Sequence, residues 1–515
     1  MADEVVKKEQ PLNLKITGKS HVKPEKKIGR KEYQLVTFDL PYLAFYYNQK
    51  LLFYKGDSDF ERMVKKLKEG LSVVLEEFHQ LAGQIGKDEE GVFRVEYDDD
   101  MQGVEVSEAI ISDEIGVADL TVAESTKILK ELIPYSGVLN LEGMHRPLLA
   151  IQLTKLKDGL AMGCAFNHAV LDGTSTWQFM SSWANICSGE PSTSAPPFLD
   201  RTKARNTCVK LDLSLPEIKL QSNRDAKPDP ILIEKPNGDA KPETILNEKL
   251  NGDVKPEPIL DEKLNGDVKP EPIFDEKLNG DAKPEPKLKE KPNGDAKPEP
   301  ILREKIFKFS ESAIDQIKLT VNQNLPSNDS KPFSTFQTLS THIWRRVTIA
   351  RNLKPEDYTV FTVFVDCRKR INPPMPEAYF GNLIQAIFTV TAAGLLLAQP
   401  SQFGASLIQK AIEAHDSKAI DERNKEWESS PKIFEFKDAG VNCVAVGSSP
   451  RFKVYDIDFG WGKPENVRSG TNNKFDGMIY LYPGKSGGRS IDVELTLEPE
   501  AMGRLEQDKE FLLEV

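Results

Sequence analysis

The sequence contains few cysteines, no cluster of basic residues and no long apolar run. Its five cysteines are scattered and form no C-x-x-C pair, so we expect reduced, buried thiols rather than a disulfide framework. The net charge is −12. Nucleic acids and anionic membranes bind clusters of Lys and Arg, and neither is therefore an expected partner.

Exported and membrane-spanning proteins also match this composition poorly. Residues 1–10 lack the apolar core of a signal peptide, and apolar runs such as 392–398 are far shorter than the roughly 20 residues of a membrane span. We expect a protein of the cytosol without a transmembrane segment.

Several catalytic signatures are missing as well. The chain has no G-x-S-x-G, no H-E-x-x-H and no Cys/His set at zinc-ligand spacing. The string at 482–486 resembles the end of a phosphate loop, but Ile479 stands where the first glycine is required. These absences argue against a serine hydrolase and a phosphate-loop site, and no metal is expected.

A 14-residue repeat interrupts the chain, with aspartate at positions 225, 239, 253, 267, 281 and 295. Residues 225–304 hold 20 acidic and 14 basic residues and 13 of the 34 prolines. Proline opposes both helix and strand, and each repeat has too few apolar side chains to offset the entropy of ordering the chain. We predict a disordered crossover insert at 222–304. The alternative is that the repeats recruit a partner.

The remaining chain divides into two nearly equal halves, which we expect to be folded domains at 16–221 and 305–515, preceded by a flexible N-terminus at 1–15. Apolar spacing predicts helices in 60–82, 174–186, 333–347 and 405–418. Strands are predicted in 92–97, 147–154, 160–166, 358–366, 452–459 and 490–497. Because helices and strands mix in both halves, we predict an α/β (α+β) fold with mixed sheets flanked by helices.

One histidine and one aspartate follow the predicted strand 160–166 directly. His168 and Asp172 form an H-x-x-x-D pair on a strand-to-helix connection, with Gly173 beside the aspartate. Side chains in such connections are held by rigid elements, and histidine is suited to remove a proton near neutral pH. His168 is thus a candidate general base. A hydrogen-bonded core histidine is the alternative.

A second distinctive string, D-F-G-W-G at 458–462, lies in the other half. Its two glycines, Gly460 and Gly462, indicate backbone conformations that other residues resist. The string is typical either of a functional loop or of a simple turn at the end of a strand.

H168-A-V-L-D-G173, Y379-F-G-N382 and D458-F-G-W-G462, in this order and spacing, resemble the plant BAHD acyltransferases. The resemblance covers nearly all of the chain outside the N-terminus and the repeats. The strings at 38–49, 160–177 and 373–388 resemble members of the family that act in cutin formation. The resemblance to the family implies a monomer of two chloramphenicol-acetyltransferase-like domains with a channel between them. No bound cofactor is implied, because acyl-CoA is a co-substrate.

The resemblance also implies roles for individual residues. His168 would be the general base that deprotonates the acceptor hydroxyl. Asp172 would point away from His168 and pair with Arg368. Asp458 would brace its own loop together with Gly460 and Gly462, and the indole N–H of Trp461 is a candidate donor to the oxyanion. Residues that bind coenzyme A are not identified.

The expected function is therefore transfer of an acyl group from a coenzyme A thioester to a hydroxylated acceptor, a hydroxy fatty acid or a derivative used in cutin. A phenolic or amine acceptor is one alternative. A protein of the same fold that only binds ligands is another, although the intact His168 argues against it.

Overall fold

The computed structural model describes residues 12–56, 59–111, 115–121, 126–190, 195–213, 302–323, 325, 331–433 and 442–513. The insert predicted to be disordered lies outside the described residues except for its last three positions. There β9 (Arg303–Phe309) already begins, and Glu304 is fully buried. The expected boundary at 305 is therefore slightly late. At the other end, Leu12 is buried in a core cluster, so the folded chain starts before residue 16.

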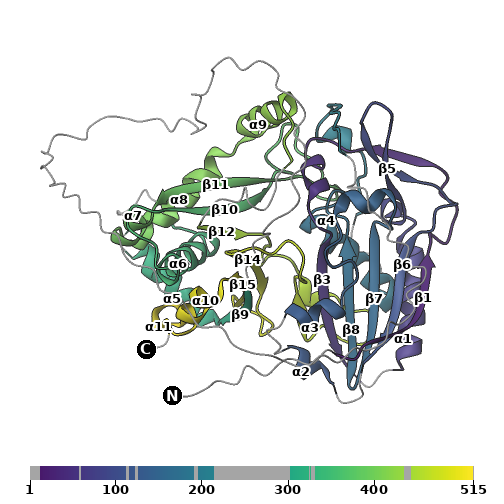
Figure 1. Ribbon diagram of the computed structural model, residues 1–515, viewed down its shortest axis with the longest axis horizontal. Coiled ribbons are helices and arrows are strands. Elements are labelled where there is room, and N and C mark those ends of the chain that lie inside the picture. Colours follow the sequence, from purple (N-terminus) through teal and green to yellow (C-terminus); the bar gives the residue numbers. More distant parts are fainter. Residues whose placement is uncertain are drawn as a thin grey trace, which may run out of the picture. The chain divides into compact units, whose positions relative to one another are not determined.

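A six-stranded mixed sheet forms the N-terminal half (Figure 1), in the order β1-β6-β7-β8-β3-β13. Its strands are β1 (Lys15–Val22), β6 (Val104–Ile110), β7 (Leu149–Leu156), β8 (Gly159–Phe166), β3 (Asn48–Lys55) and β13 (Asn466–Arg468). Only β6 and β7 pair in parallel. The edge strand β13 comes from the C-terminal part of the chain, so the two halves share this sheet.

Helices cover both faces of this sheet. One core cluster joins it to α1 (Phe60–Val74) and α4 (Gly173–Ser188), and a smaller cluster on the other face includes residues of α2 (Val117–Thr121) and α3 (Thr126–Glu131). Short 3-10 helices complete this half: η1 (Leu40–Ala44), η2 (His79–Ala82), η3 (Asn140–Met144) and η4 (Arg201–Lys203). A three-stranded sheet accompanies them, made of β2 (Lys31–Gln34), β5 (Phe93–Tyr97) and β4 (Gln84–Lys87).

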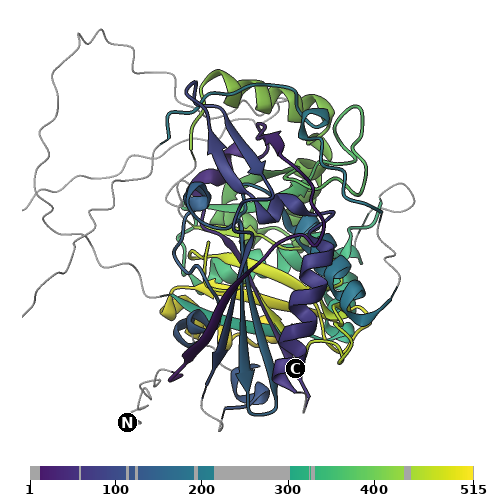
Figure 2. The same cartoon turned by 90° about the vertical axis from the view of Figure 1, so that its right-hand side faces the viewer.

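The C-terminal half has a second six-stranded mixed sheet, in the order β11-β10-β12-β14-β15-β9. Its further strands are β11 (Ile384–Ala392), β10 (Tyr358–Asp366), β12 (Cys443–Val446), β14 (Met478–Pro483) and β15 (Ile491–Leu497). The helices of this half are α5 (Glu311–Asn322), α6 (Thr335–Ala350), α7 (Ala393–Ala398), α8 (Ser401–Ala414), α9 (Ser417–Ser429), α10 (Pro499–Glu506) and α11 (Lys509–Leu512). In Figure 2 the yellow strands of this sheet cross behind the blue strands of the first sheet.

The two faces of the second sheet differ in character, because side chains alternate along each strand. Val493 and Leu495 face an apolar cluster that includes residues of α5, α6, α8 and α10. Tyr480 and Tyr482 face the other way and belong to the same cluster as the core of the N-terminal half. The core is therefore continuous across the halves.

Three local predictions are wrong. The helix expected over 60–82 ends at Val74, because Phe78 turns out of the helix path to pack against Phe179 and Phe380. The segment 452–459 forms a 3-10 turn (Val454–Asp456) instead of a strand. Its alternating apolar side chains pack individually into the core and do not form one face of a paired strand. Cys208 is exposed, unlike the other four cysteines.

Candidate active site

His168 follows the end of β8 by two residues and is held through its backbone by two asparagines. Its N–H donates to Oδ1 of Asn140 at 2.8 Å, and its carbonyl accepts from Nδ2 of Asn382 at 2.7 Å. Asn140 opens η3 and Asn382 precedes β11, so elements from both halves fix this one residue. Such a backbone clamp leaves the imidazole available for chemistry.

The imidazole ring of His168 lies against Tyr42 of η1. The ring centroids are 4.4 Å apart and the planes differ by 4°. The side chain is half-buried, and its Nδ1 is buried without a hydrogen-bond partner in the described part of the chain. Burial lowers the pKa of His168 below its ordinary value, although the charge of Asp172 opposes this shift. The lowered pKa favours the neutral ring, which is the form that a proton acceptor needs.

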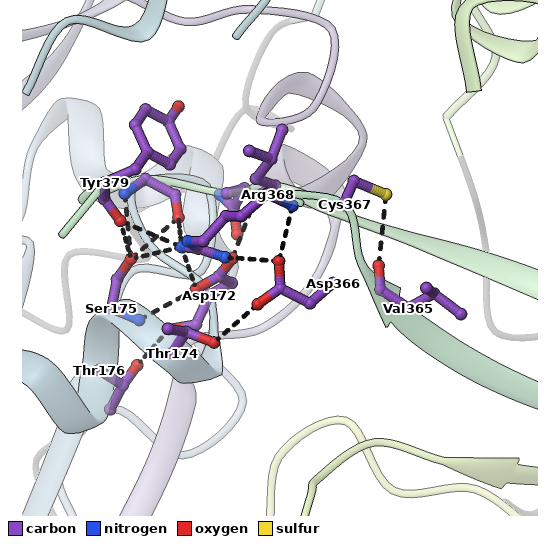
Figure 3. A network of polar contacts seen from close by, with 12 residues as sticks. Asp172, Thr174, Ser175, Thr176, Val365, Asp366, Cys367, Arg368 and Tyr379 are labelled. Atoms are coloured by element: carbon purple, nitrogen blue, oxygen red, sulfur yellow. Dashed lines mark hydrogen bonds and ion pairs between the residues drawn. The ribbon is translucent and has the colours of Figure 1, made fainter. Parts of the chain in front are cut away.

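Asp172 caps α4 and makes a bidentate ion pair with Arg368 (Figure 3). Its Oδ1 accepts from Ser175 N at 3.0 Å. Arg368 Nη1 donates to Oδ2 at 2.8 Å and Nη2 donates to Oδ1 at 3.0 Å. Leu383 N donates to Oδ2 at 3.0 Å. Both carboxylate oxygens thus carry two hydrogen bonds each, which uses the full acceptor capacity of the group.

This arrangement fixes the charge of Asp172. Burial alone would raise the pKa of its carboxyl, but the Arg368 guanidinium and the N–H groups of Ser175 and Leu383 hold the pKa below its usual value. The carboxylate is directed at Arg368, and none of its hydrogen bonds reaches His168. The structure thus brings Asp172 and Arg368 together and separates Asp172 from the imidazole.

The Y-F-G-N string wraps around this ion pair. The carbonyls of Tyr379 and Gly381 accept from Arg368 Nη2 at 3.1 and 3.3 Å. A Cβ at Gly381 would come within 2.6 Å of the Tyr379 hydroxyl oxygen and 2.9 Å of Nη1 of Arg201. Glycine is required there because the backbone itself lies against buried side chains.

The D-F-G-W-G loop is held by its own aspartate. Asp458 Oδ1 accepts from Gly460 N at 2.7 Å and from Gly462 N at 3.0 Å. Both glycines have positive φ, 98° and 113°, a conformation that other residues rarely adopt. The hydrogen bonds of Asp458 therefore stay within five residues of chain.

Trp461 lies far from His168. Its indole packs near Tyr54 of β3, and Tyr54 pairs with Leu160 at the start of β8, whereas Asn48 pairs with Phe166 at its end. Six residues of strand separate these two positions, or about 20 Å. The neighbouring Gly460 adjoins Ser188, the last residue of α4, while His168 precedes that helix.

The oxyanion role that we expected for Trp461 is therefore inconsistent with the structure. A donor must lie about 3 Å from the oxygen on which charge develops. Trp461 Nε1 is buried without a partner in the described segments, but it lies at the opposite end of both β8 and α4. The resemblance singled out the loop as a motif, but spacing in the sequence could not locate it in space.

Three residues of this site were not predicted from the sequence: Tyr42, Asn140 and Asn382. Asn382 was visible within the Y-F-G-N string but received no role. Tyr42 and Asn140 are joined, because Asn140 Nδ2 donates to the Tyr42 carbonyl at 2.8 Å. Neither has a distinctive sequence pattern.

Among the described residues, no group of three metal-ligating side chains occurs. No helix within the described ranges is long and apolar enough to cross a membrane.

Comparisons with known proteins agree with this arrangement. The model of the Transferase family matches residues 12–230 and 255–512. The chain is 56% identical over 514 residues to "BAHD acyltransferase DCR" of Arabidopsis thaliana, covering 98% of this chain and 93% of that protein. It is 27% identical over 450 residues, 85% of each chain, to "Hydroxycinnamoyl-CoA:5-hydroxyanthranilate N-hydroxycinnamoyltransferase HHT1" of Avena sativa. The crystal structure of vinorine synthase has the same fold, with 19% identity, a TM-score of 0.66 and 98% of each chain covered.

Proposed function

Because the chain belongs to the BAHD acyltransferases of the Transferase family, we propose that it esterifies a hydroxylated fatty acid, or a derivative used in cutin, with an acyl group from coenzyme A. Acyl-CoA-dependent acyl transfer is the reaction of the family. The acceptor is the new element, and it is supported by the strings that resemble the cutin-forming members.

His168 is the general base in this proposal. A substrate channel between the halves brings the acceptor hydroxyl to the imidazole, which takes its proton while the oxygen attacks the thioester carbonyl. The carbon–sulfur bond then breaks, and the coenzyme A thiolate takes up the proton. A thiolate is a good leaving group, so a base and correct positioning suffice without a covalent acyl-enzyme.

The observation that carries the proposal is that His168 and Asp172 have separate hydrogen-bond partners. The four hydrogen bonds of Asp172 are all made to Arg368 and to backbone N–H groups. His168 therefore acts without an aspartate partner, held instead through its backbone and by Tyr42. Asp172 and Arg368 are structural, as are Asp458, Gly460 and Gly462 in their own loop.

The acceptor class has one specific alternative. The oat relative carries an N-acyltransferase name, so transfer to an amine is the second candidate. A general base near neutrality serves either nucleophile, because each loses a proton on attack. Only a direct comparison of acceptors separates the two.

The test is release of free thiol from a panel of acyl-CoA donors by the purified protein. Hydroxy fatty acids, phenols and amines of matched chain length serve as acceptors. The proposal predicts thiol release that depends on the hydroxy fatty acid, with an ester as product. Thiol release with amines alone would show that the acceptor is an amine and not a hydroxy fatty acid. Thiol release with no acceptor in the panel would favour the alternative of a protein of this fold that only binds ligands.

The proposal further includes a monomer in the cytosol, based on the resemblance alone. Gel filtration with light scattering gives the mass in solution, and a fluorescent fusion gives the location. A stable dimer would overturn the proposed monomer, and a fusion protein confined to an organelle would overturn the proposed location in the cytosol.

A further inference from the structure

Lys50 is a lysine at a core position of β3. The side chains of Asn48, Lys50, Leu52 and Tyr54 alternate onto one face of the strand. Leu52 and Tyr54 belong to the large core cluster, and Lys50 itself is 4% exposed. Lysine is almost never fully buried unless its charge is compensated. The side chain therefore calls for a partner.

This ammonium has no direct ion pair: burial disfavours its charge, and the charge of Glu494 favours it only from a distance. Lys50 Nζ donates to Asn48 Oδ1 at 3.1 Å and lies 5.7 Å from the centroid of the Tyr480 ring. No carboxylate lies within 4 Å of it in the described segments. An ammonium has three N–H donors, so two of them are not used by protein groups that the structure describes.

The nearby carboxylates already have partners. Glu304 and Glu494 are almost fully buried, and both are bound by Lys474. Arg468 also pairs with each of them, at 3.0 Å to Glu304 and 3.9 Å to Glu494. Both carboxylates are thus bound by Lys474 and Arg468, and neither forms an ion pair with Lys50.

Lys50 is therefore a buried cation without an ion-pair partner among the described residues. Lys474 Nζ lies 5.5 Å from the centroid of the same Tyr480 ring, so two ammonium groups flank one aromatic side chain. Burial lowers the pKa of Lys50 to about 8, and the charged form still dominates at pH 7. An anion bound beside Lys50 would supply the missing ion-pair partner.

The ammonium lies near the reacting end of the strand. Lys50 Nζ reaches back to Asn48, and Asn48 pairs with Phe166, two residues before His168. In addition to burial, the charge of Lys50 lowers the pKa of His168. An acceptor that presents its hydroxyl to His168 can therefore place another polar group at Lys50.

We propose that Lys50 binds the free carboxylate of the acceptor and so makes the enzyme selective for hydroxy fatty acids over their esters. The inference rests on the proposed function, because it assigns the far end of the same acceptor. An ammonium–carboxylate hydrogen bond in a buried site is short and strong, and its loss leaves a charge unpaired. Lys50 is a specificity residue here and takes no part in proton transfer.

The experiment compares a hydroxy fatty acid with its methyl ester, using one acyl-CoA donor. Lys50→Met keeps the length of the side chain and removes the charge. We expect at least a tenfold rise in KM for the acid, little change for the ester and an unchanged KM for the donor. Lys50→Arg should retain part of the preference. Lys55→Met, at the exposed end of the same strand, is the matched control.

A measurement of acceptor binding without turnover tests this inference separately from the proposed function. Calorimetry should show that the unmodified protein binds the acid at least tenfold more tightly than the ester, and that Lys50→Met removes the difference. If this holds without any turnover, the proposed reaction fails and the carboxylate site stands. Equal binding of acid and ester by the unmodified protein overturns the inference. A rise confined to the donor KM would overturn it too, by assigning Lys50 to a phosphate of coenzyme A.

Discussion

Asp172 and Asp458 both stand in glycine-containing turns, but different parts of the chain bind the two carboxylates. Asp172 is fully buried and its ion-pair partner, Arg368, is 196 residues away in the sequence. Asp458 is half-buried and, within the described part of the chain, accepts hydrogen bonds from Gly460 and Gly462. The first aspartate therefore fastens two halves together at the site, whereas the second shapes a local turn.

The difference matters because the two motifs look equally distinctive in the sequence. Only the buried one is bound close to the turn that carries His168, whereas the other follows Ile457, which binds Tyr54 at the opposite end of β8. The same substitution at both aspartates should therefore have very different consequences, and the variants below test this contrast from the largest expected effect to the smallest.

Asp172→Asn should destabilise the fold the most. It leaves the Arg368 guanidinium buried without its main counter-charge, and breaking a buried pair in this way costs about 3–5 kcal/mol. The free energy of unfolding, measured by urea titration, should fall by that amount and turnover should fall with it. An unchanged stability together with a shifted pH–rate profile would instead indicate a His–Asp dyad.

The pH dependence of stability sharpens this test. The pKa of Asp172 is lower in the folded state than its unfolded value of about 3.9. The ion pair thus contributes fully above about pH 4 and is lost as the pH falls through the folded pKa. The Asp172→Asn variant should lack this part of the acid dependence.

Asp458→Asn should have a much smaller effect. The amide oxygen of asparagine can accept the same two N–H donors, so the loop keeps its turn. We expect a change in unfolding free energy within about 1 kcal/mol, measured in the same urea titration. A loss as large as that of Asp172→Asn would show that the two loops are not different in kind.

Trp461→Phe should have the smallest effect on catalysis. The ring still packs against Phe459 and Tyr54, and the lost indole N–H lies far from the reacting atoms. We expect kcat to change by less than about twofold, whereas loss of an oxyanion donor costs roughly 100- to 1,000-fold. A fall of that size in a folded variant would restore the oxyanion role to Trp461.

Local patterns in the sequence predicted most of the elements around the site. The strand before His168 was expected at 160–166 and is observed as β8, and the helix expected in 333–347 is observed as α6. Tyr358–Asp366 is β10, as predicted. In each of these segments the apolar residues follow a single helix or strand period, and the ends of the pattern are clear. Contacts with distant residues therefore did not change the local secondary structure.

The failures come from contacts between distant parts of the chain. The apolar residues of 452–459 alternate as in a strand, but the Tyr54 hydroxyl and the core of the other half bind this segment as a turn. Lys50 stands in an apolar strand, and its spacing gives no sign that Glu494 and Lys474 lie near it. Asn140 and Asn382 act on His168 from 28 and 214 residues away. No local window of sequence contains these relations.

Replacement of His168 by alanine tests the central claim that this residue alone supplies the base. The side chain is half-buried and its clamp is made by the backbone, so the melting temperature should change little. A positioned base contributes on the order of 100- to 10,000-fold to the rate, and kcat/KM for thiol release should fall by that factor. A folded His168→Ala protein that keeps more than about a tenth of the unmodified kcat/KM would contradict the claim, because that loss is smaller than any positioned base would cause.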